Sequence, residues 1–253
     1  MYKSKTINQR SKSCFLFDVD GTLTEARQEM SSEFEDFFKS WMGNKKVYLV
    51  SGSDLPKIKE QIPVDILYKC DGVFTSMGNE YWKFKRTRVI GVFKEECVYQ
   101  KELDLPDEIE DWLSSKLESS TFEYRKAPHF EYRSGALNFS VVGRGANTNL
   151  RQYYSEWDET NKERETIAKQ FNKKFKNKHG IQALVGGQIS LDIQPVGNDK
   201  GQVVNHVKGD EIIFFGDRCY EGGNDYSLAQ KADTFWQVNS WKETKQILES
   251  DYK

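Results

Sequence analysis

The chain has 253 residues, of which 37% are hydrophobic, 13% aromatic and 30% charged, enough for one large domain or two modest ones. A net charge of −2 provides no general attraction to nucleic acid or to an anionic membrane, so we expect neither partner. The polar, basic first 13 residues are predicted to be a disordered lead-in without a signal peptide. No apolar run approaches the roughly 20 residues of a membrane span. Four widely spaced cysteines without a CxxC pair indicate reduced thiols and a cytoplasmic protein.

Strand and helix patterns alternate at the start of the chain. A buried strand is predicted around residues 15–17, and a helix over 31–41 is capped by Ser31 or Ser32. A strand at 46–50 follows, then a helix that Asp54 caps, and further short strands at 66–68 and 71–75. This alternation predicts a parallel sheet with right-handed crossovers.

The pattern changes near residue 87. The sequence predicts strands at 89–93, 122–124, 130–133, 136–142, 182–185 and 188–193, and helices at 106–117 and 160–176. Beyond them it predicts helices at 198–207 and 241–249 and strands at 211–215 and 234–238. The expected fold is therefore α/β, with a Rossmann-like parallel-sheet core over 1–87 and 196–253. An α+β cap over 88–195 interrupts that core.

Two carboxylates follow the first predicted strand, at Asp18 and Asp20, and Gly21 and Thr22 come next. Asp-Gly alone is typical of a plain β-turn. After a buried strand, however, period-2 geometry places both aspartates on one side of an extended chain, at the edge where open α/β sheets bind ligands. Two neighbouring anions repel unless a cation joins them, which favours a hard ion such as Mg²⁺.

The Asp18 segment resembles the first motif of the haloacid dehalogenase superfamily of phosphotransferases, and three further motifs follow in order. The resemblance implies that Asp18 is the nucleophile and Asp20 the general acid/base. It also implies that a hydroxyl of Ser51, or alternatively Ser53, binds the transferring phosphoryl group. Lys200 would offset the negative charge there.

The fourth motif comprises Phe214-Phe215-Gly216-Asp217 and the later Gly223-Asn224-Asp225. The resemblance implies an Mg²⁺ ion held by Asp217, a side-chain oxygen of Asp18 and the backbone carbonyl of Asp20. Asn224 and Asp225 would orient the groups around that ion.

Longer strings resemble the eukaryotic-type phosphomannomutases over nearly the whole chain. They are FDVDGTLT at 17–24, EYRSGALNFSVVGR at 131–144, GGQISLD at 186–192, FFGD at 214–217 and GGND at 222–225. The substrate contacts that this family implies fall on Arg27, Arg133, Arg144, Arg151, Ser190 and Asp192.

These residue types suit a hexose phosphate, because arginine matches phosphate geometry with paired donors and Ser190 and Asp192 share one face of a strand. A single arginine is otherwise typical of a surface salt bridge, but three in one short segment favour anion binding.

The resemblance implies a mutase that interconverts mannose 6-phosphate and mannose 1-phosphate, with glucose phosphates as further substrates. It would use Mg²⁺ and a hexose 1,6-bisphosphate activator, and form a homodimer through the cap; residues 89–99 are one candidate surface. The alternatives are a sugar-phosphate phosphatase and a non-catalytic sugar-phosphate-binding protein.

The sequence departs from the family at two places: Ser51 stands where the family usually has Gly, and Lys231 replaces an acidic residue three before Thr234. That acidic residue helps to bind a second cation in the family, so we expect none here.

Overall fold

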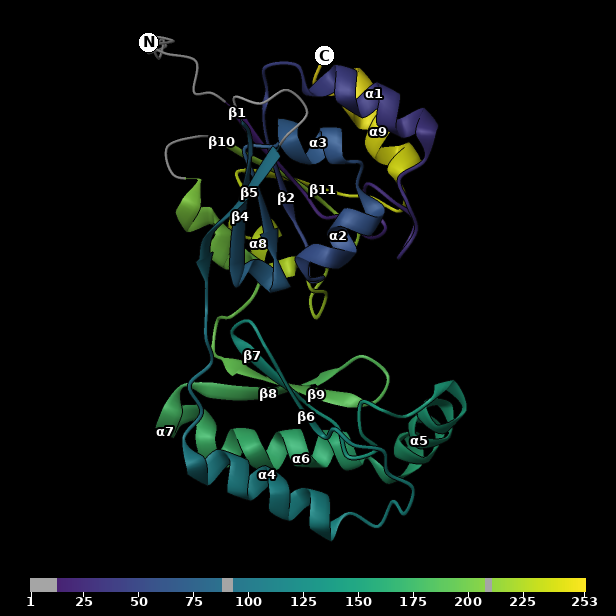
Figure 1. Cartoon of the computed structure of the whole chain (residues 1–253), viewed down its shortest axis with the longest axis vertical. Coiled ribbons are helices and arrows are strands. Elements are labelled where there is room, and N and C mark those ends of the chain that lie inside the picture. Colours follow the sequence, from purple (N-terminus) through teal and green to yellow (C-terminus); the bar gives the residue numbers. More distant parts are fainter. Residues whose placement is uncertain (1–12, 88–92, 208–210) are drawn as a thin grey trace, which may run out of the picture. The chain divides into compact units, whose positions relative to one another are not determined.

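The computed structural model describes residues 13–87, 93–207 and 211–253, and it divides into two compact units (Figure 1). The core unit comprises Met1–Tyr99 and Asp199–Lys253, and the insert unit comprises Gln100–Asn198. The sequence placed the boundaries at 87/88 and 195/196. Nearly all of the predicted lead-in, and all but the last residue of the strand predicted at 89–93, lie outside the described residues.

The core unit contains a seven-stranded sheet in the order β11-β10-β1-β2-β3-β4-β5. Its strands are β1 Ser13–Phe17, β2 Lys46–Val50, β3 Gly72–Thr75, β4 Glu80–Arg86, β5 Phe93–Gln100, β10 Glu211–Gly216 and β11 Thr234–Gln237. The five strands from β11 to β3 run parallel, whereas β4 is antiparallel to β3. The predicted α/β core is therefore confirmed, with a mixed rather than purely parallel sheet.

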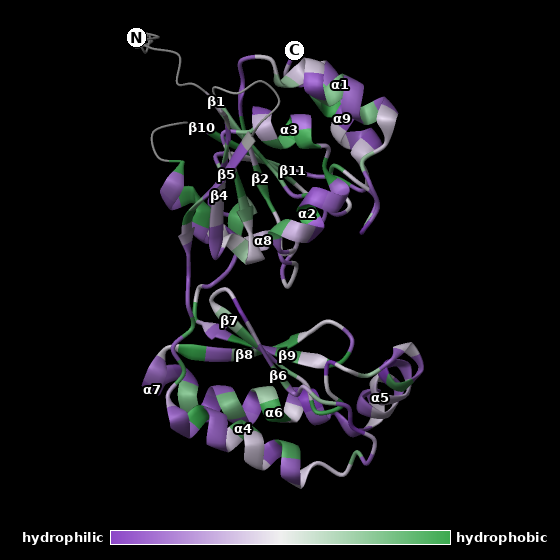
Figure 2. Ribbon diagram, in the orientation of Figure 1, coloured by the Kyte–Doolittle hydropathy of each residue, from purple (hydrophilic) through white to green (hydrophobic). Residues whose placement is uncertain are grey.

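Strands β1 and β10 are neighbouring interior strands of this sheet and are almost entirely apolar. Leu16, Phe17, Phe214 and Phe215 are fully buried, as strands covered on both faces require. Figure 2 shows hydrophobic residues along the inner strands, while the helices also carry hydrophilic ones. The register pairs Phe17 with Phe215, so the residues that follow the two strands leave the sheet at the same edge.

The helices of the core unit are α1 Ser32–Met42, α2 Leu55–Gln61, α3 Val64–Lys69, α8 Tyr226–Ala229 and α9 Trp241–Asp251, with 3₁₀ segments η1 Ser76–Gly78 and η3 Lys200–His206. Helices α1, α2 and α9 follow the prediction, whereas α3 and α8 were not predicted and the helix expected over 198–207 is a 3₁₀ segment. Ser31 caps α1 and Asp54 caps α2 through their side chains. The strand predicted at 66–68 is wrong: these residues belong to α3 and bury Ile66 and Leu67 against the core. A short apolar run has no periodicity that separates strand from helix.

The insert unit packs helices against a four-stranded antiparallel sheet in the order β6-β7-β9-β8. The strands are β6 Phe130–Arg133, β7 Ala136–Phe139, β8 Ile181–Gly186 and β9 Ser190–Pro195. The helices are α4 Asp107–Ser119, α5 Thr148–Asn161, α6 Glu163–Phe171 and α7 Asn177–His179, with a π segment, η2, at Asn172–Lys176.

Three details of the insert differ from the prediction. Helix α5 was not predicted, the segment 122–124 forms no strand, and the helix predicted at 160–176 begins only at Glu163. The chain bends at Lys162, whose φ of 54° is left-handed and separates α5 from α6. In the part of the chain that the structure describes, no helix combines the length and the apolarity that crossing a bilayer demands.

Candidate active site

Asp18 directly follows β1 and lies almost completely buried, with 3% of its surface exposed. Its backbone N–H donates to the carbonyl oxygen of Phe215 at 2.9 Å, which continues the β1–β10 ladder by one residue. This bond fixes the nucleophile candidate at the end of a rigid central strand. Such placement limits the movement of the carboxylate relative to its neighbours.

Lys200 joins the carboxylates of Asp18 and Asp225 in a buried ion cluster. Its Nζ donates to Asp18 Oδ1 and lies 2.7 Å from Asp225 Oδ1, and neither Lys200 nor Asp225 has measurable exposure. Lys200 is the first residue of η3, which Asp199 caps by accepting the N–H of Gly201 at 2.9 Å. A lysine from the last third of the chain therefore balances charge at the end of the first strand.

Burial raises the pKa of Asp18 to about 7, although the ammonium of Lys200 opposes the shift. Burial and the carboxylate of Asp225 raise the pKa of Asp217 to about 6. For Lys200, burial favours the neutral form, but Asp18 and Asp225 outweigh it and raise its pKa above the usual range. The site thus holds one positively charged lysine among several carboxylates, and this single cation does not balance all of their negative charge.

The residues around Asp18 fit a hard divalent cation. Asp18, Asp217 and Asp225 each offer an oxygen, and these oxygens lie within 4.8 Å of one another. The buried Oδ1 of Asn224 has no hydrogen-bond partner within the described ranges. A Cβ at Gly21, where φ is +78°, would lie 2.7 Å from Asp217 Oδ2, so glycine leaves room for this carboxylate. All these donors are oxygens, the ligands that Mg²⁺ prefers.

The raised pKa values predict a pH-dependent stability for the metal-free protein. Folded Asp18 binds its proton more tightly than the unfolded chain, so the free energy of unfolding should fall as pH rises from about 4 to about 7. Between pH 5 and pH 8 the loss attributable to Asp18 should be about 2.5 kcal/mol. Urea unfolding in EDTA, for wild type and Asp18→Asn, measures it. Saturating Mg²⁺ should remove most of the difference, and identical pH profiles for the two proteins would contradict the prediction.

Asp20 is held by two donors that come from different parts of the core unit. Its Oδ1 accepts the backbone N–H of Arg27 at 2.6 Å and Nε2 of Gln61 at 2.8 Å. Gln61 is buried at the end of α2, whereas Arg27 is exposed and has a left-handed φ of 60°. Sequence reasoning missed Gln61, because nothing local marks a glutamine 41 residues away as the partner of Asp20.

Ser51 follows β2 at the same edge of the sheet and is 1% exposed. Its N–H donates to Phe74 O at 2.8 Å, and its Oγ accepts the N–H of Ser53 at 3.0 Å. The hydroxyl proton of Ser51 is not used in that bond, so it remains available as a donor. Of the two alternatives, Ser51 has the more buried side chain.

Lys231 contacts the turn that carries Lys200. Its Nζ donates to the carbonyl oxygen of Gly201 at 3.2 Å, and a Cβ on Gly201 would lie 3.0 Å from that nitrogen. We therefore expect the ammonium to take the place of a second cation. Crystals soaked in Mn²⁺ should show anomalous density beside Asp217 and none beside Lys231; a peak at Lys231 would contradict this.

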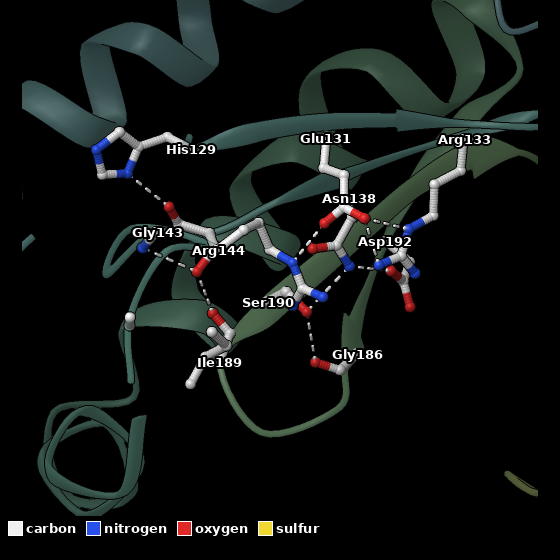
Figure 3. Close-up of polar contacts among 12 residues, drawn as sticks. His129, Glu131, Arg133, Asn138, Gly143, Arg144, Gly186, Ile189, Ser190 and Asp192 are labelled. Atoms are coloured by element: carbon white, nitrogen blue, oxygen red, sulfur yellow. Dashed lines mark hydrogen bonds and ion pairs between the residues drawn. The ribbon is translucent and has the colours of Figure 1, made fainter. Parts of the chain in front are cut away.

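Four of the predicted substrate residues of the insert unit lie around one polar face of its sheet, namely Arg133, Arg144, Ser190 and Asp192 (Figure 3). Glu131 Oε1 accepts Nε and Nη2 of Arg133 at 3.1 and 2.9 Å, and its Oε2 accepts Nε of Arg144 at 2.6 Å. One carboxylate therefore orients two guanidinium groups and leaves their remaining N–H donors for another anion. Glu131 was not predicted as a site residue, although its neighbour Arg133 was.

Arg151 differs from the other two arginines of this segment. Its Nε donates to Ala146 O at 2.8 Å, and its Nη2 donates to Arg144 O at 2.8 Å. Those bonds hold the loop that carries Arg144 against the start of α5. Ser190 and Asp192 lie on β9, where both accept a hydrogen bond from Asn138 on β7.

Comparisons with known proteins agree on one family. A family model described as eukaryotic phosphomannomutase matches residues 34–253. A phosphomannomutase of Schizosaccharomyces pombe is 34% identical over 226 residues, covering 86% of this chain and 85% of that protein. A phosphomannomutase of Saccharomyces cerevisiae is 32% identical over 244 residues, covering 95% of this chain and 94% of that protein.

Solved structures share the fold at low sequence identity. An IMP-nucleotidase of Plasmodium falciparum, a D172N mutant with IMP bound, has a TM-score of 0.61 and 14% identity, with coverage of 95% of this chain and 66% of that one. A haloacid dehalogenase-like hydrolase from Bacteroides thetaiotaomicron has a TM-score of 0.56 and 15% identity over 94% of this chain and 98% of that one. The fold is thus that of the haloacid dehalogenase-like proteins, and by sequence the chain belongs to the eukaryotic phosphomannomutase family.

Proposed function

We propose that this chain interconverts mannose 6-phosphate and mannose 1-phosphate, and that it also accepts glucose phosphates, which differ at one hydroxyl configuration. The observation that carries the proposal is the buried contact of Lys200 with Asp18 at the end of β1. A carboxylate held there beside a fixed cation is suited to accept a phosphoryl group. The family relationship supports the choice of sugar.

In the proposed reaction, Asp18 attacks the phosphorus atom of a bisphosphate sugar, the bond to the sugar oxygen breaks, and an acyl phosphate forms on Asp18. Asp20 gives its proton to the departing sugar oxygen. In the reverse step Asp20 removes a proton from a hydroxyl of the incoming sugar phosphate, and that oxygen takes the phosphoryl group from Asp18. Mg²⁺, bound by Asp18, Asp217 and the backbone carbonyl of Asp20, would offset the charge of the phosphoryl oxygens.

The proposal assigns a separate role to the arginines of the insert unit. Arg133 and Arg144 would bind the phosphate that does not react, using the donors that Glu131 leaves free. Ser190 and Asp192 would bind sugar hydroxyls, and Arg151 would hold Arg144 in place. Arg27 would contribute a further charged contact from the core unit. A hexose 1,6-bisphosphate would phosphorylate Asp18 at the start of the cycle.

A coupled assay with and without glucose 1,6-bisphosphate tests this function. Mannose 1-phosphate should be converted to mannose 6-phosphate only when the bisphosphate is present, with little release of inorganic phosphate. Phosphate release that does not respond to the bisphosphate would instead show a sugar-phosphate phosphatase. Binding of sugar phosphates without either reaction would show the non-catalytic alternative.

The hydrogen bonds to Asp20 predict graded effects of two substitutions. Asp20→Ala removes the proposed acid/base and should lower kcat by about 10²–10⁴-fold. Gln61→Leu leaves the carboxylate but removes one of its two orienting donors, so its loss in kcat should be smaller, roughly 10-fold. The control is Gln152→Leu, which removes an exposed amide from the insert unit. Equal kcat for wild type and Asp20→Ala would exclude the acid/base role.

We also propose a cytoplasmic homodimer that forms through the insert unit, by analogy with the family. Residues 93–99 of the candidate surface lie in β5 and therefore belong to the core unit, not to the insert unit, and residues 89–92 lie outside the described residues. The insert unit itself exposes Tyr124, Tyr153 and Val185 by half or more of their surface. Sedimentation of the full chain as a monomer at micromolar concentration would contradict the dimer.

A further inference from the structure

We propose that Asn138 turns Ser190 and Asp192 into a pair of hydrogen-bond acceptors, so that the insert unit selects sugar phosphates by their free hydroxyl donors. The inference rests on the proposed function and extends it to a residue that binds no phosphate. Asn138 is a positioning residue in this scheme, because it acts on the ligand through its two neighbours.

Asn138 lies in the middle of the polar face shown in Figure 3. It is 4% exposed, and on its two sides in the sheet it pairs with Glu131 of β6 and Asp192 of β9. Its Nδ2 donates to Ser190 Oγ at 3.0 Å and to Asp192 Oδ1 at 2.7 Å. Both donor hydrogens of the amide are thereby used on two residues that lie two apart on one strand.

The hydroxyl proton of Ser190 is also committed. Ser190 Oγ donates to the carbonyl oxygen of Gly186 at 3.1 Å while it accepts from Asn138. A serine oxygen has two acceptor positions, so one lone pair remains for a ligand and no proton does. Ser190 can therefore meet a ligand only as an acceptor.

The carboxylate of Asp192 is placed by Asn138 on one side and by a glycine on the other. A Cβ built on Gly186 would lie 2.2 Å from Asp192 Oδ2, so a larger residue there would displace the carboxylate. An ionised carboxylate has no donor, and Oδ2 of Asp192 is not the oxygen that Asn138 binds. Ser190 and Asp192 together thus present acceptors on one face of the sheet.

The orientation of the Asn138 amide follows from the same contacts. Exchanging its nitrogen and oxygen would place Oδ1 against the carboxylate of Asp192, where two acceptors repel. In the observed orientation Oδ1 is buried and has no hydrogen-bond partner in the described part of the chain. A buried acceptor without a partner costs free energy, which the two bonds donated to Ser190 and Asp192 offset. The net effect of the amide is to fix the positions of the Ser190 hydroxyl and the Asp192 carboxylate.

Two acceptors require a ligand that supplies donors, such as the hydroxyl groups of an unmodified hexose. A ligand that lacks one of these hydroxyls leaves a charged or polar acceptor without its bond, and should bind about 10- to 100-fold more weakly. Mannose 6-phosphate and a set of analogues, each with one hydroxyl replaced by hydrogen, provide the probes.

The test compares dissociation constants from calorimetry, and kcat/KM values, for wild type, Asn138→Leu and Gly186→Ala. Wild type should bind at least one deoxy analogue about 10- to 100-fold more weakly than mannose 6-phosphate. Both variants should reduce the ratio of the two dissociation constants, analogue to mannose 6-phosphate, to about threefold or less. Asn138→Leu would do so by releasing Ser190 and Asp192, and Gly186→Ala by displacing Asp192. The change should appear in KM more than in kcat, because the reacting groups belong to the other unit.

The control is Asn172→Leu, which removes another amide from the insert unit. The side-chain amide of Asn172 bonds the backbone of Ala183, with Nδ2 2.9 Å from its carbonyl oxygen and Oδ1 2.8 Å from its nitrogen. This variant should lose stability and keep the wild-type ratio. This inference alone would be overturned if the wild type bound mannose 6-phosphate and every analogue equally. It would also be overturned if Asn138→Leu and Gly186→Ala kept the wild-type ratio of dissociation constants between the analogue and mannose 6-phosphate. A wild type that binds no hexose phosphate would overturn the proposed function and the inference together.

Discussion

Replacing Asp18 by asparagine is expected to abolish phosphoryl transfer and leave the chain folded. The amide cannot form the acyl phosphate, so kcat should fall by about 10⁴-fold or more. The fold should persist because Lys200 keeps its contact with Asp225 at 2.7 Å. In metal-free buffer at pH 8 the variant should be more stable than wild type, since the charged form of Asp18 is disfavoured by burial.

The rate is measured by the coupled mutase assay, and stability by urea unfolding in EDTA. Asp54→Asn provides a matched control that makes the same chemical change at the cap of α2. Asparagine caps a helix as well as aspartate does, so activity and stability should remain close to wild type. An Asp18→Asn protein with turnover within tenfold of wild type would remove Asp18 from the nucleophile role.

Lys200→Met is expected to cause the largest loss of stability. The substitution keeps an unbranched side chain but removes the cation between the buried carboxylates of Asp18 and Asp225. Breaking a buried ion pair on one side typically costs about 3–5 kcal/mol, because the remaining charge is left without a partner. Activity should be lost as well, since Lys200 contacts the proposed nucleophile directly.

Two further variants test whether the loss of stability in Lys200→Met comes from the missing buried charge. Lys59→Met removes a lysine that pairs with Glu95 on the surface, and should change the free energy of unfolding by less than about 1 kcal/mol. The double variant Lys200→Met/Asp225→Asn removes one of the two uncompensated charges and should recover part of the stability. Equal unfolding free energies for Lys200→Met and Lys59→Met would contradict a charge-balancing role.

The strand-end pattern indicated where Asp18 and Asp217 would lie, because it depends on local sequence. Asp18 and Asp217 each follow a mostly apolar strand, and parallel strands bring such ends to one edge. Asp225 was expected only to orient other groups, yet its carboxylate bonds Lys200 and lies in the cluster with Asp18. Its position depends on the turn after β10, where its N–H donates to Arg218 O at 3.2 Å. No periodic pattern encodes such a turn.

The residues that orient the site side chains, Gln61 and Asn138, escaped prediction for a different reason. Gln61 reaches Asp20 across 41 residues of sequence, and Asn138 reaches Asp192 across 54. A glutamine at the end of a helix and an asparagine within a strand are individually ordinary, and only tertiary contact gives them a role. Sequence reasoning found the groups proposed to react and missed the groups that hold them.

The errors in the fold likewise have local causes. β4 and β5 extend the core sheet into the region where the composition changes, so the sequence placed the first domain boundary at 87/88, twelve residues before the observed division at 99/100. Helix α5 was missed because only Tyr154 and Asp158 are buried along it, which leaves little apolar periodicity.

The pairing of β1 with β10 has a consequence for biosynthesis. Phe17 pairs with Phe215, and the whole insert unit lies between them in the chain. During translation, one side of β1 therefore lacks its neighbour until residues 211–216 have left the ribosome. The insert unit is continuous and needs no later segment to complete its own sheet. The proposed active site is consequently incomplete until the insert unit has been synthesised, because Lys200, Asp217 and Asp225 all follow it in the chain.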